Sequence, residues 1–383
     1  MKYTTAILLS FCFSARSFSQ GIDNENFVIT HGPWLQNLSP TGITVIWTTN
    51  RPAVPGVNIT GPDGNNRFVR NSHDGIIDGG GLLHKVRIDG LKSGMTYRYS
   101  INSVQILKYQ AYRIYYGDTL SGRTENFATP SPGAEKVSFT VFNDVHELSG
   151  KMASYIKHSN AANRDFYFFN GDMVNYLQQS NQLFTGFIDT AVFYFAAGKP
   201  FYYVRGNHET RGYESRELKS YFDFKDDRFY YSFDWGPVHF IVLDAGEDKP
   251  DNNRYYYGLA DYDSYRLKEL EWLKEELKSD AFRKAKHRIV MVHMPVIKAE
   301  KLNQAMTFMT EYYGPLFQSA GIDLLISAHT HRNAFFEKDK SGFGYPVLVN
   351  SNNSFVEVEA DRNGINAIVK DTEGKTLFTY NIK

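Results

Sequence analysis

The sequence has one cysteine, no excess of either charge and no long apolar run beyond its first residues. Because Cys12 stands alone among 383 residues, a disulfide within the chain and a thiolate metal site are both excluded. Lys and Arg number 42 and Asp and Glu number 42, which argues against a protein held to nucleic acid by bulk positive charge. No later apolar stretch approaches the roughly 20 residues that a membrane-spanning helix needs. We therefore expect neither a stable nucleic-acid partner nor a transmembrane anchor.

The composition is that of a folded chain with more than one domain. Hydrophobic residues make up 42% and aromatic residues 15%, which excludes a disordered protein, since such a chain buries too little apolar surface to offset its entropy. A length of 383 residues exceeds what one core usually organises, so we expect two domains.

The N-terminus has the pattern of a secretory signal. Lys2 supplies positive charge, residues 6–15 form a short apolar run, and residues 17–19 place small side chains around a cleavage site. We predict a signal peptide over residues 1–19 and a secreted or periplasmic protein; a buried N-terminal helix is the alternative. Lipidation of Cys12 is not expected, because bulky Phe11 precedes it where such sites have a small residue.

Residues 20–130 have the pattern of an all-β domain. Apolar and polar residues alternate over 43–48, as in a strand with one face on a core. Turn residues recur at short intervals, at Pro52, Pro55, 61–64, 79–81 and 92–94, and no helical period of useful length is present. These features predict a β-sandwich.

Two details within this domain resemble a fibronectin type III module. Trp47 stands where a sandwich keeps a large buried aromatic, and residues 91–97 resemble a tyrosine corner ending in Tyr97. The domain has no cluster of histidines and carboxylates, so we assign it no chemistry. Residues 131–133 form a short linker to the second domain, which we place at 131–383.

Beyond residue 135 the pattern changes to alternating strands and helices. Apolar runs of strand length occur at 137–142, 166–169, 200–204, 240–243, 289–292 and 324–326, and further strands follow at 334–337, 347–349, 355–359, 365–370 and 376–380. Leucines at helical spacing over 267–277 predict an amphipathic helix on a sheet. Runs this apolar are typical of strands covered on both faces, which predicts a layered α/β domain.

Five of these strands end in polar residues that can bind metal. The segments are Asn143-Asp144-Val145-His146-Glu147, Asn170-Gly171-Asp172, Arg205-Gly206-Asn207-His208-Glu209, His293-Met294-Pro295 and Ser327-Ala328-His329-Thr330-His331. Ligands of open α/β sheets collect beyond the carboxyl ends of the strands, so five strands of one sheet would bring these residues together.

The donor atoms favour two transition-metal ions. Seven residues offer carboxylate, imidazole or amide oxygen and no sulfur: Asp144, His146, Asp172, Asn207, His293, His329 and His331. Such mixed N/O sets suit Mn, Fe, Zn or Ni. Seven donors are too many for one tetrahedral ion and suit two ions that share a carboxylate.

The order of these motifs resembles the calcineurin-like metallophosphoesterase superfamily. D-x-H, G-D, G-N-H-E, an apolar strand into His and H-x-H occur in sequence between about residues 135 and 340. With the preceding sandwich, the whole chain is similar to the purple-acid-phosphatase-related branch, and residues 32–37 resemble that branch's opening strand. The resemblance implies a β-sandwich flanked by helices (αββα) and the hydrolysis of small phosphorylated substrates.

Three positions depart from the purple acid phosphatases. His146 stands where they have glycine, so an imidazole replaces a ligand that they supply otherwise. Asn175 occupies the position of their metal-binding tyrosine and Tyr176 follows it, so we expect no tyrosinate–iron bond. Ala328 replaces a glycine before the H-x-H motif, a small change that should leave both histidines competent.

The resemblance implies a role for each site residue. Asp144, His146 and His331 hold one metal; Asn207, His293 and His329 hold the other; Asp172 bridges them. A hydroxide shared by the two ions attacks phosphorus in line. His208 delivers the leaving-group proton or stabilises the transition state.

Two further residues keep open interpretations. Glu209 either orients His208 or forms a salt bridge with Arg205 or Arg211. Asn175 either contacts the ligand or completes the turn.

Two rival functions remain open. The first is a phosphodiesterase or nucleotide pyrophosphatase, which would need contacts for a second ester group. Such contacts could come from four tyrosines that would stack a base or sugar, namely Tyr255, Tyr256, Tyr257 and Tyr262. We favour the alternative that these tyrosines pack at the domain interface. A catalytically inactive secreted binding protein is the rival of another class, but degenerate enzymes usually lose ligands and none is missing here.

Overall fold

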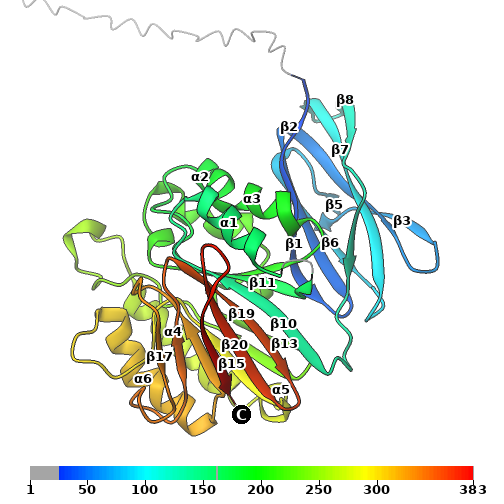
Figure 1. Ribbon diagram of the computed structural model, residues 1–383. Helices are drawn as coiled ribbons and strands as arrows, with labels where there is room; N and C mark the ends of the chain where they lie inside the picture. Colours follow the sequence, from blue (N-terminus) through cyan, green and yellow to red (C-terminus); the bar gives the residue numbers. More distant parts are fainter. Residues whose placement is uncertain (1–25, 161–162, 383) are drawn as a thin grey trace, which may run out of the picture.

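The computed structural model describes residues 26–160 and 163–382. It has an all-β domain at the N-terminal end and a larger domain of mixed sheets and helices (Figure 1). The predicted signal peptide and Cys12 lie outside the described residues. Among the residues that are described, no helix is both long and apolar enough to span a bilayer.

The N-terminal domain is built around one very long strand. Its strands are β1 (Ile29–Ser39), β2 (Gly42–Thr60), β3 (Asn66–Val69), β4 (Ser72–His73), β5 (Ile76–Ile77), β6 (Gly81–Asp89), β7 (Thr96–Gln110), β8 (Arg113–Ser121) and β9 (Glu125–Ala128). β2 pairs with β1 and β6 over its first part and with β7 and β3 over its second. The turns predicted at Pro52 and Pro55 are therefore wrong. Both lie inside β2, where a register shift after Thr48 accommodates the break in pairing.

The aromatic residues singled out in this domain are buried as predicted. Trp47 is fully buried, and its Nε1 donates to Ser103 Oγ at 2.8 Å. Tyr97 accepts a hydrogen bond from the backbone N–H of Lys92 at 2.7 Å, which is the bond expected of a tyrosine corner. The all-β nature of the domain is thus confirmed, while its identity as a fibronectin type III module stays a prediction.

The second domain contains two six-stranded sheets, as the predicted αββα layering requires. The first has the order β12 (Phe201–Val204), β11 (Phe166–Asn170), β10 (Lys136–Phe142), β19 (Ser354–Asp361), β20 (Gly364–Asp371), β21 (Thr376–Ile382); the second has β13 (Tyr231–Trp235), β14 (Val238–Val242), β15 (His287–Met291), β16 (Leu324–Ser327), β18 (Val347–Val349), β17 (Ala334–Phe336). Aromatic side chains fill the space between them; the rings of Phe139 and Phe240 lie 5.3 Å apart edge to face. Placing the five site strands in one sheet was wrong.

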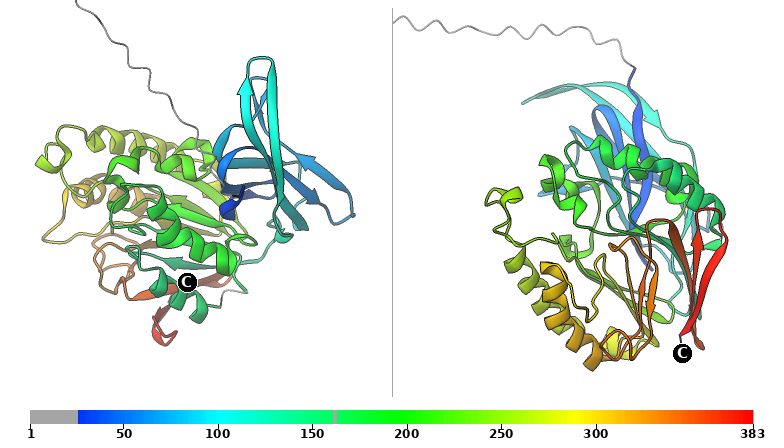
Figure 2. Two further views of the ribbon diagram at one scale, coloured as in Figure 1. Left: turned by 90° about the horizontal axis from the view of Figure 1, so that it is seen from above. Right: turned by 60° about the vertical axis from the view of Figure 1, so that its left-hand side comes forward.

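Helices cover the outer faces of both sheets (Figure 2). The α-helices are α1 (Ser149–His158), α2 (Asn181–Leu183), α3 (Asp189–Ala191), α4 (Tyr262–Glu276), α5 (Asp280–Lys284) and α6 (Gln304–Ala320). Shorter helical segments are η2 (Phe184–Ile188), η3 (Val192–Ala196), η4 (His208–Thr210), η5 (Tyr213–Arg216), η6 (Leu218–Tyr221), η7 (Lys225–Asp227) and η8 (Arg254–Tyr256). The predicted αββα layering and mixed α/β class therefore agree with the structure.

The buried face of α4 is only partly the leucine stripe predicted for it. Leu270 and Leu273 are buried, but Leu267 is half exposed. Arg266 and Glu269 are fully buried instead. They are accommodated because the Arg266 guanidinium donates to two backbone carbonyls and the Glu269 carboxylate accepts from a backbone N–H and a tyrosine hydroxyl.

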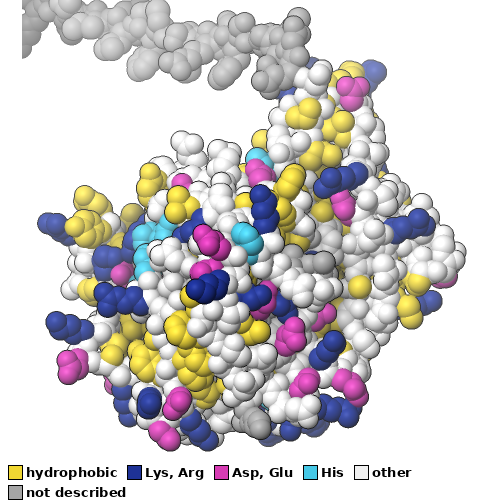
Figure 3. All heavy atoms as spheres, viewed as in Figure 1, with side chains coloured by type: hydrophobic (Ala, Val, Ile, Leu, Met, Phe, Trp, Pro, Cys, Tyr) yellow, Lys and Arg dark blue, Asp and Glu magenta, His cyan; other side chains and the backbone are white. Residues whose placement is uncertain are grey.

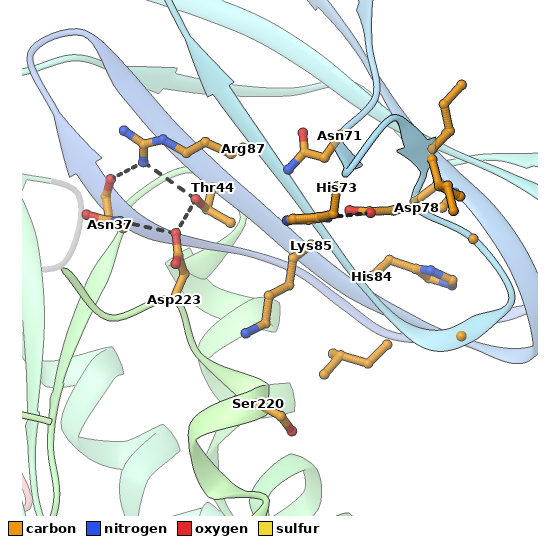
Figure 4. Close-up of a pocket in the computed structure, with 16 residues that line it drawn as sticks. Asn37, Thr44, Asn71, His73, Asp78, His84, Lys85, Arg87, Ser220 and Asp223 are labelled. Atoms are coloured by element: carbon orange, nitrogen blue, oxygen red, sulfur yellow. Dashed lines mark hydrogen bonds and ion pairs between the residues drawn. The ribbon is translucent and has the colours of Figure 1, made fainter. Parts of the chain in front are cut away.

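The two domains are joined by polar contacts beside a hollow of about 800 Å³ (Figure 4). The Asp223 carboxylate accepts hydrogen bonds from the side chains of Asn37 and Thr44, both in the N-terminal domain. Lys85 donates to the backbone carbonyl of Phe222. These bonds attach the segment after η6 to the sheet of the first domain.

A buried histidine of the second sheet, His239, pairs with two carboxylates and should make stability depend on pH. His239 Nδ1 lies 2.7 Å from Asp234 and its Nε2 lies 3.2 Å from Glu276. Burial lowers the pKa of His239, but the two carboxylates outweigh burial and raise the pKa above its usual 6.5. The stabilisation is therefore complete below about pH 6.5 and is lost as the pH rises through the raised value.

We expect His239→Gln to lower the free energy of unfolding by about 1–2 kcal/mol at pH 5.5 and by much less at pH 9. Urea unfolding at the two pH values measures this difference. His73→Gln, at an exposed His–Asp pair, is the control and should change little at either pH because solvent screens the pair. An equal loss for His239→Gln at both pH values would contradict the assignment.

Candidate metal centre

The five polar segments meet at one edge of the two-sheet sandwich. β10, β11 and β12 deliver three of them from the first sheet, and β15 and β16 deliver two from the second. Backbone bonds link neighbouring segments: Asp144 N–H donates to Gly171 O at 3.0 Å, and His146 N–H donates to Asp172 O at 3.0 Å. The Asp144 carboxylate accepts from the His329 N–H at 3.2 Å and so connects the two sheets.

Local backbone geometry turns these side chains inward. Asp144, His146, Asp172, His329 and His331 all have positive φ angles between 49° and 67°. Such left-handed conformations are costly for residues with a side chain and concentrate at functional sites. The strand ends are therefore held in a conformation that the surrounding packing imposes.

Two glycines make the close approach of the segments possible. A Cβ on Gly171 would collide with the His293 ring, and a Cβ on Gly206 would collide with the Asp172 carboxylate and with Glu209. Steric crowding therefore explains why the G-D and G-N-H-E motifs have glycine at these two positions.

The first candidate metal cluster consists of Asp144, His146 and His331. Their ligand atoms lie within 4.8 Å of one another. His146 Nε2 is 3.2 Å from His331 Nε2, and Asp144 Oδ1 is 3.2 Å from His331 Nε2. Asp144 is fully buried, whereas the His331 side chain is 45% exposed, so the cluster is open to solvent on one side.

The second candidate cluster consists of Asp172, His293 and His329, again within 4.8 Å. His293 Nε2 lies 3.1 Å from Asp172 Oδ2, and His329 Nδ1 lies 3.0 Å from Asn207 Oδ1. The other nitrogen of His293 lies 2.8 Å from the carbonyl of Asn170, to which it can donate, leaving Nε2 free to ligate. The amide oxygen of Asn207 therefore points at the same place as this cluster.

Burial and charge set the protonation of these groups. Burial lowers the pKa of His146 and lowers that of His329 to about 4, so both rings are neutral at physiological pH. For His293 burial also lowers the pKa, but the Asp172 carboxylate outweighs it and raises the pKa to about 10. Burial raises the pKa of Asp172, but His293 and His208 outweigh it and leave the pKa below its usual value.

The unsatisfied atoms of the site fit a cation. Asp144 Oδ1 and His293 Nε2 are buried, and neither has a hydrogen-bond partner of acceptable geometry among the described residues. Each nevertheless lies within 3.2 Å of another potential ligand atom. Donor atoms that converge without bonding one another are what a metal ion satisfies. The mixed N/O set, without sulfur, suits transition metals as predicted.

His208 lies beside both clusters. Its ring is 4.8 Å from that of His146, and its Nε2 is 3.9 Å from Asp172 Oδ2. Its Nδ1 lies 2.7 Å from the carbonyl of Asn175, which fixes the ring and leaves Nε2 facing the site. The Arg211 guanidinium lies 3.3 Å from that Nε2.

The interpretations of Glu209 are both wrong. Its carboxylate is fully buried and contacts neither His208 nor an arginine; it accepts from the N–H groups of Asp172, Met173, Val174 and Gly206 at 2.6–3.4 Å. Arg205 and Arg211 pair instead with Asp244 and Glu247. Burial, with the Asp172 charge adding to it, raises the pKa of Glu209.

Asn175 ties its turn to the segment after β10, while its contact with a ligand stays a prediction. Its side chain donates to the carbonyl of His146 at 3.2 Å, and its backbone N–H donates to Glu147. Tyr176 is half exposed, and the absence of a tyrosinate–iron bond stays a prediction.

Several residues of the site escaped the sequence analysis. Asn143 Nδ2 donates to Asp144 Oδ2 at 2.8 Å, and Asn303 Nδ2 lies 3.2 Å from His329 Nε2. Asn143 directly follows β10, so its position at a strand end could have marked it as a site residue. Asn303 and Glu247, the partner of Arg211, come from segments distant in the chain, and nothing in the local sequence marks them.

Searches of known proteins agree with this geometry. The calcineurin-like phosphoesterase family matches residues 137–333. No curated protein sequence matches the chain.

Two solved structures share the fold. A purple acid phosphatase from yellow lupin seeds aligns over 91% of this chain and 73% of its own, with a TM-score of 0.67 and 15% identity. A structure of PhoD aligns over 91% of this chain and 88% of its own, with a TM-score of 0.60 and 12% identity. The predicted resemblance is confirmed: the chain belongs to the calcineurin-like phosphoesterase family and is a hydrolase of phosphate-ester bonds.

Proposed function

We propose that this chain is an exported phosphomonoesterase with a dinuclear metal centre. The observation that supports it best is the arrangement of two three-residue clusters, Asp144–His146–His331 and Asp172–His293–His329, at one edge of the sandwich. Asp144 and Asp172 are buried carboxylates. Asp172 Oδ2 lies 3.1 Å from His293 Nε2, and the Asp172 carbonyl accepts from the N–H of His146, a member of the first cluster, so this residue adjoins both clusters.

Each residue has a definite task in this proposal. Asp144, His146 and His331 would hold one ion, Asn207, His293 and His329 would hold the other, and Asp172 would be shared by both. The bound ions, Mn, Fe, Zn or Ni, would supply Lewis acidity that acidifies water and neutralises charge on the phosphoryl oxygens. The exposed side of His331 leaves an entry for the phosphate group.

His208 is the candidate for proton delivery. With Nδ1 directed at the Asn175 carbonyl, Nε2 is the atom able to exchange a proton with a departing alkoxide. The alternative role is to bind the phosphoryl oxygens in the transition state. The Arg211 guanidinium beside Nε2 adds positive charge at the same place.

A substrate panel tests the proposal as a whole. The metal-loaded protein is assayed against phosphomonoesters and phosphodiesters, and its metal content is measured. We expect turnover of monoesters with about two ions per chain. If diesters are turned over faster than monoesters, the protein is a phosphodiesterase instead. If it binds metal but turns over no substrate, the inactive binding protein is favoured. Export is checked by N-terminal sequencing of the protein from the extracellular or periplasmic fraction, where we expect a start at Gln20.

The role of His208 is tested with a leaving-group series. We expect His208→Ala to retain both ions, because seven other side chains fill the sites, and to lower kcat about 10²–10⁴-fold for alkyl phosphates. The loss should shrink for nitrophenyl phosphate, whose phenolate leaves with little help from an acid. His158→Ala, at an exposed histidine of α1, is the matched control. An equal loss for every leaving group would assign His208 to phosphoryl binding instead.

A further inference from the structure

Two adjoining hollows are lined by the segment that follows His208, and Arg211 in that segment lies 3.3 Å from His208 Nε2. One has a volume of about 520 Å³ and reaches Arg211; the other has about 440 Å³. Both are within the size range of small-molecule sites. They share a wall formed by Thr210, Ser215, Arg216, Leu259 and Tyr262. The wall is tied to the metal centre, because Thr210 Oγ1 donates to the carbonyl of Asn207 at 2.7 Å.

The first hollow has an aromatic rim that folding alone does not explain. Tyr255 is 63% exposed and Tyr257 is 89% exposed, so the predicted packing of these tyrosines at the domain interface is wrong. Tyr257 has a φ of 50°, a left-handed conformation that is strained for a bulky residue. A strained backbone that holds an aromatic ring in solvent favours a binding role over a structural one.

Both hollows are lined by positively charged side chains. Arg211, Arg216 and Lys249 line the first hollow, and Lys219, Arg228 and Lys268 line the second, with Asp227 the one carboxylate among their lining residues.

Only part of this charge is neutralised by neighbours. Four of the six named basic residues have an ion-pair partner: Arg211 with Glu247 at 2.8 Å, Lys249 with Asp248 at 2.6 Å, Lys219 with Asp227 at 2.7 Å and Arg228 with Asp226 at 2.8 Å. Within the part of the chain that is described, Arg216 and Lys268 have no ion-pair partner, and Arg216 stands in the shared wall. In Figure 3 basic and hydrophobic side chains gather at the left-hand edge beside a group of histidines.

We propose that these hollows bind the leaving group, and that they select substrates in which the terminal phosphate is linked through a second phosphate and a sugar to an aromatic base, as in nucleoside diphosphates. The proposal rests on the phosphatase function proposed above. The exposed tyrosines would stack on the base, because every base has a face suited to an aromatic ring. Arg216 would bind the second phosphate, for which a guanidinium has matching geometry.

The reaction is a hydrolysis. The oxygen of water bonds to the terminal phosphorus, and the bond from that phosphorus to the bridging oxygen breaks, with its electron pair remaining on the bridging oxygen. The products are inorganic phosphate and a nucleoside monophosphate, and the proton of the water passes to the products or to solvent.

The test compares ADP with glycerol 3-phosphate, which has neither a base nor a second phosphate. We expect Y255A/Y257A and R216Q each to lower kcat/KM for ADP about 10- to 100-fold and to leave glycerol 3-phosphate unchanged. Tyr112→Ala and Arg98→Gln, at exposed residues of the N-terminal domain, are the matched controls. Equal effects on both substrates, or no effect on ADP, would overturn the proposal.

A binding measurement separates this proposal from the function it rests on. Titration calorimetry with α,β-methylene-ADP, whose bridging oxygen is replaced by carbon, needs no turnover. We expect the wild type to bind it at least tenfold more tightly than Y255A/Y257A or R216Q. Inactivity toward all phosphate esters with this difference intact would refute the phosphatase alone; equal affinity in all variants would refute the nucleotide site.

Discussion

Asp172→Ala is expected to remove metal from the protein and to lower turnover by roughly 10³-fold or more. Asp172 is almost fully buried, one oxygen accepts from the His208 N–H at 3.0 Å, and the other lies 3.1 Å from His293 Nε2. In our assignment it is the one ligand that both ions share, so its loss weakens both sites at once. Elemental analysis of the purified protein and initial rates with a monoester measure the two effects.

The control for this substitution is Asp118→Ala, at an exposed aspartate of β8. It should retain full metal content and activity. Circular dichroism verifies that the Asp172→Ala variant is folded, so that its losses are attributed to the site. Two tightly bound ions per chain in that variant would show that Asp172 is not the bridging ligand.

Glu209→Gln is expected to be the most destabilising conservative substitution near the site. The Glu209 carboxylate accepts four backbone N–H groups from the G-D and G-N-H-E segments at 2.6–3.4 Å. In glutamine one of the two oxygens becomes an NH₂ group, which would face N–H donors and leave them unsatisfied in a buried site. We expect a loss of about 2–4 kcal/mol in the free energy of unfolding.

Urea unfolding of chelator-treated proteins measures this loss without a contribution from metal binding. Glu217→Gln, at an exposed glutamate nearby, is the control and should unfold like the wild type. Because Glu209 holds the backbone of Asp172 and Gly206, we also expect weaker metal binding in Glu209→Gln. An unchanged unfolding midpoint would mean that water or a rearranged backbone satisfies the four N–H groups.

The local sequence determined where the strands of the second domain end. Apolar runs such as 137–142 and 289–292 coincide within a residue or two with β10 and β15, because a buried strand excludes polar side chains along its length. The residues directly after those runs, Asp144 and His293 among them, are therefore recognisable as site candidates from the order of amino acids alone. The D-x-H spacing brings Asp144 and His146 into one cluster, whereas the two histidines of H-x-H fall in different clusters, His331 in the first and His329 in the second.

Local sequence did not determine which strands pair or what buried polar groups contact. The five site strands divide between two sheets, since pairing depends on packing between residues distant in the chain. Buried Arg266 and Glu269 interrupt the leucine stripe of α4, because hydrogen bonds from other segments offset the cost of burying them.

The same division holds within the site. Sequence identified Glu209 by its motif, but the tertiary structure decided that it bonds to backbone N–H groups rather than to His208. Likewise the Tyr255–Tyr257 segment was visible in the sequence, while its position beside Arg211 came from the fold. Residue types and strand ends follow from short-range burial preferences, whereas partners follow from long-range packing, which no single stretch of sequence encodes.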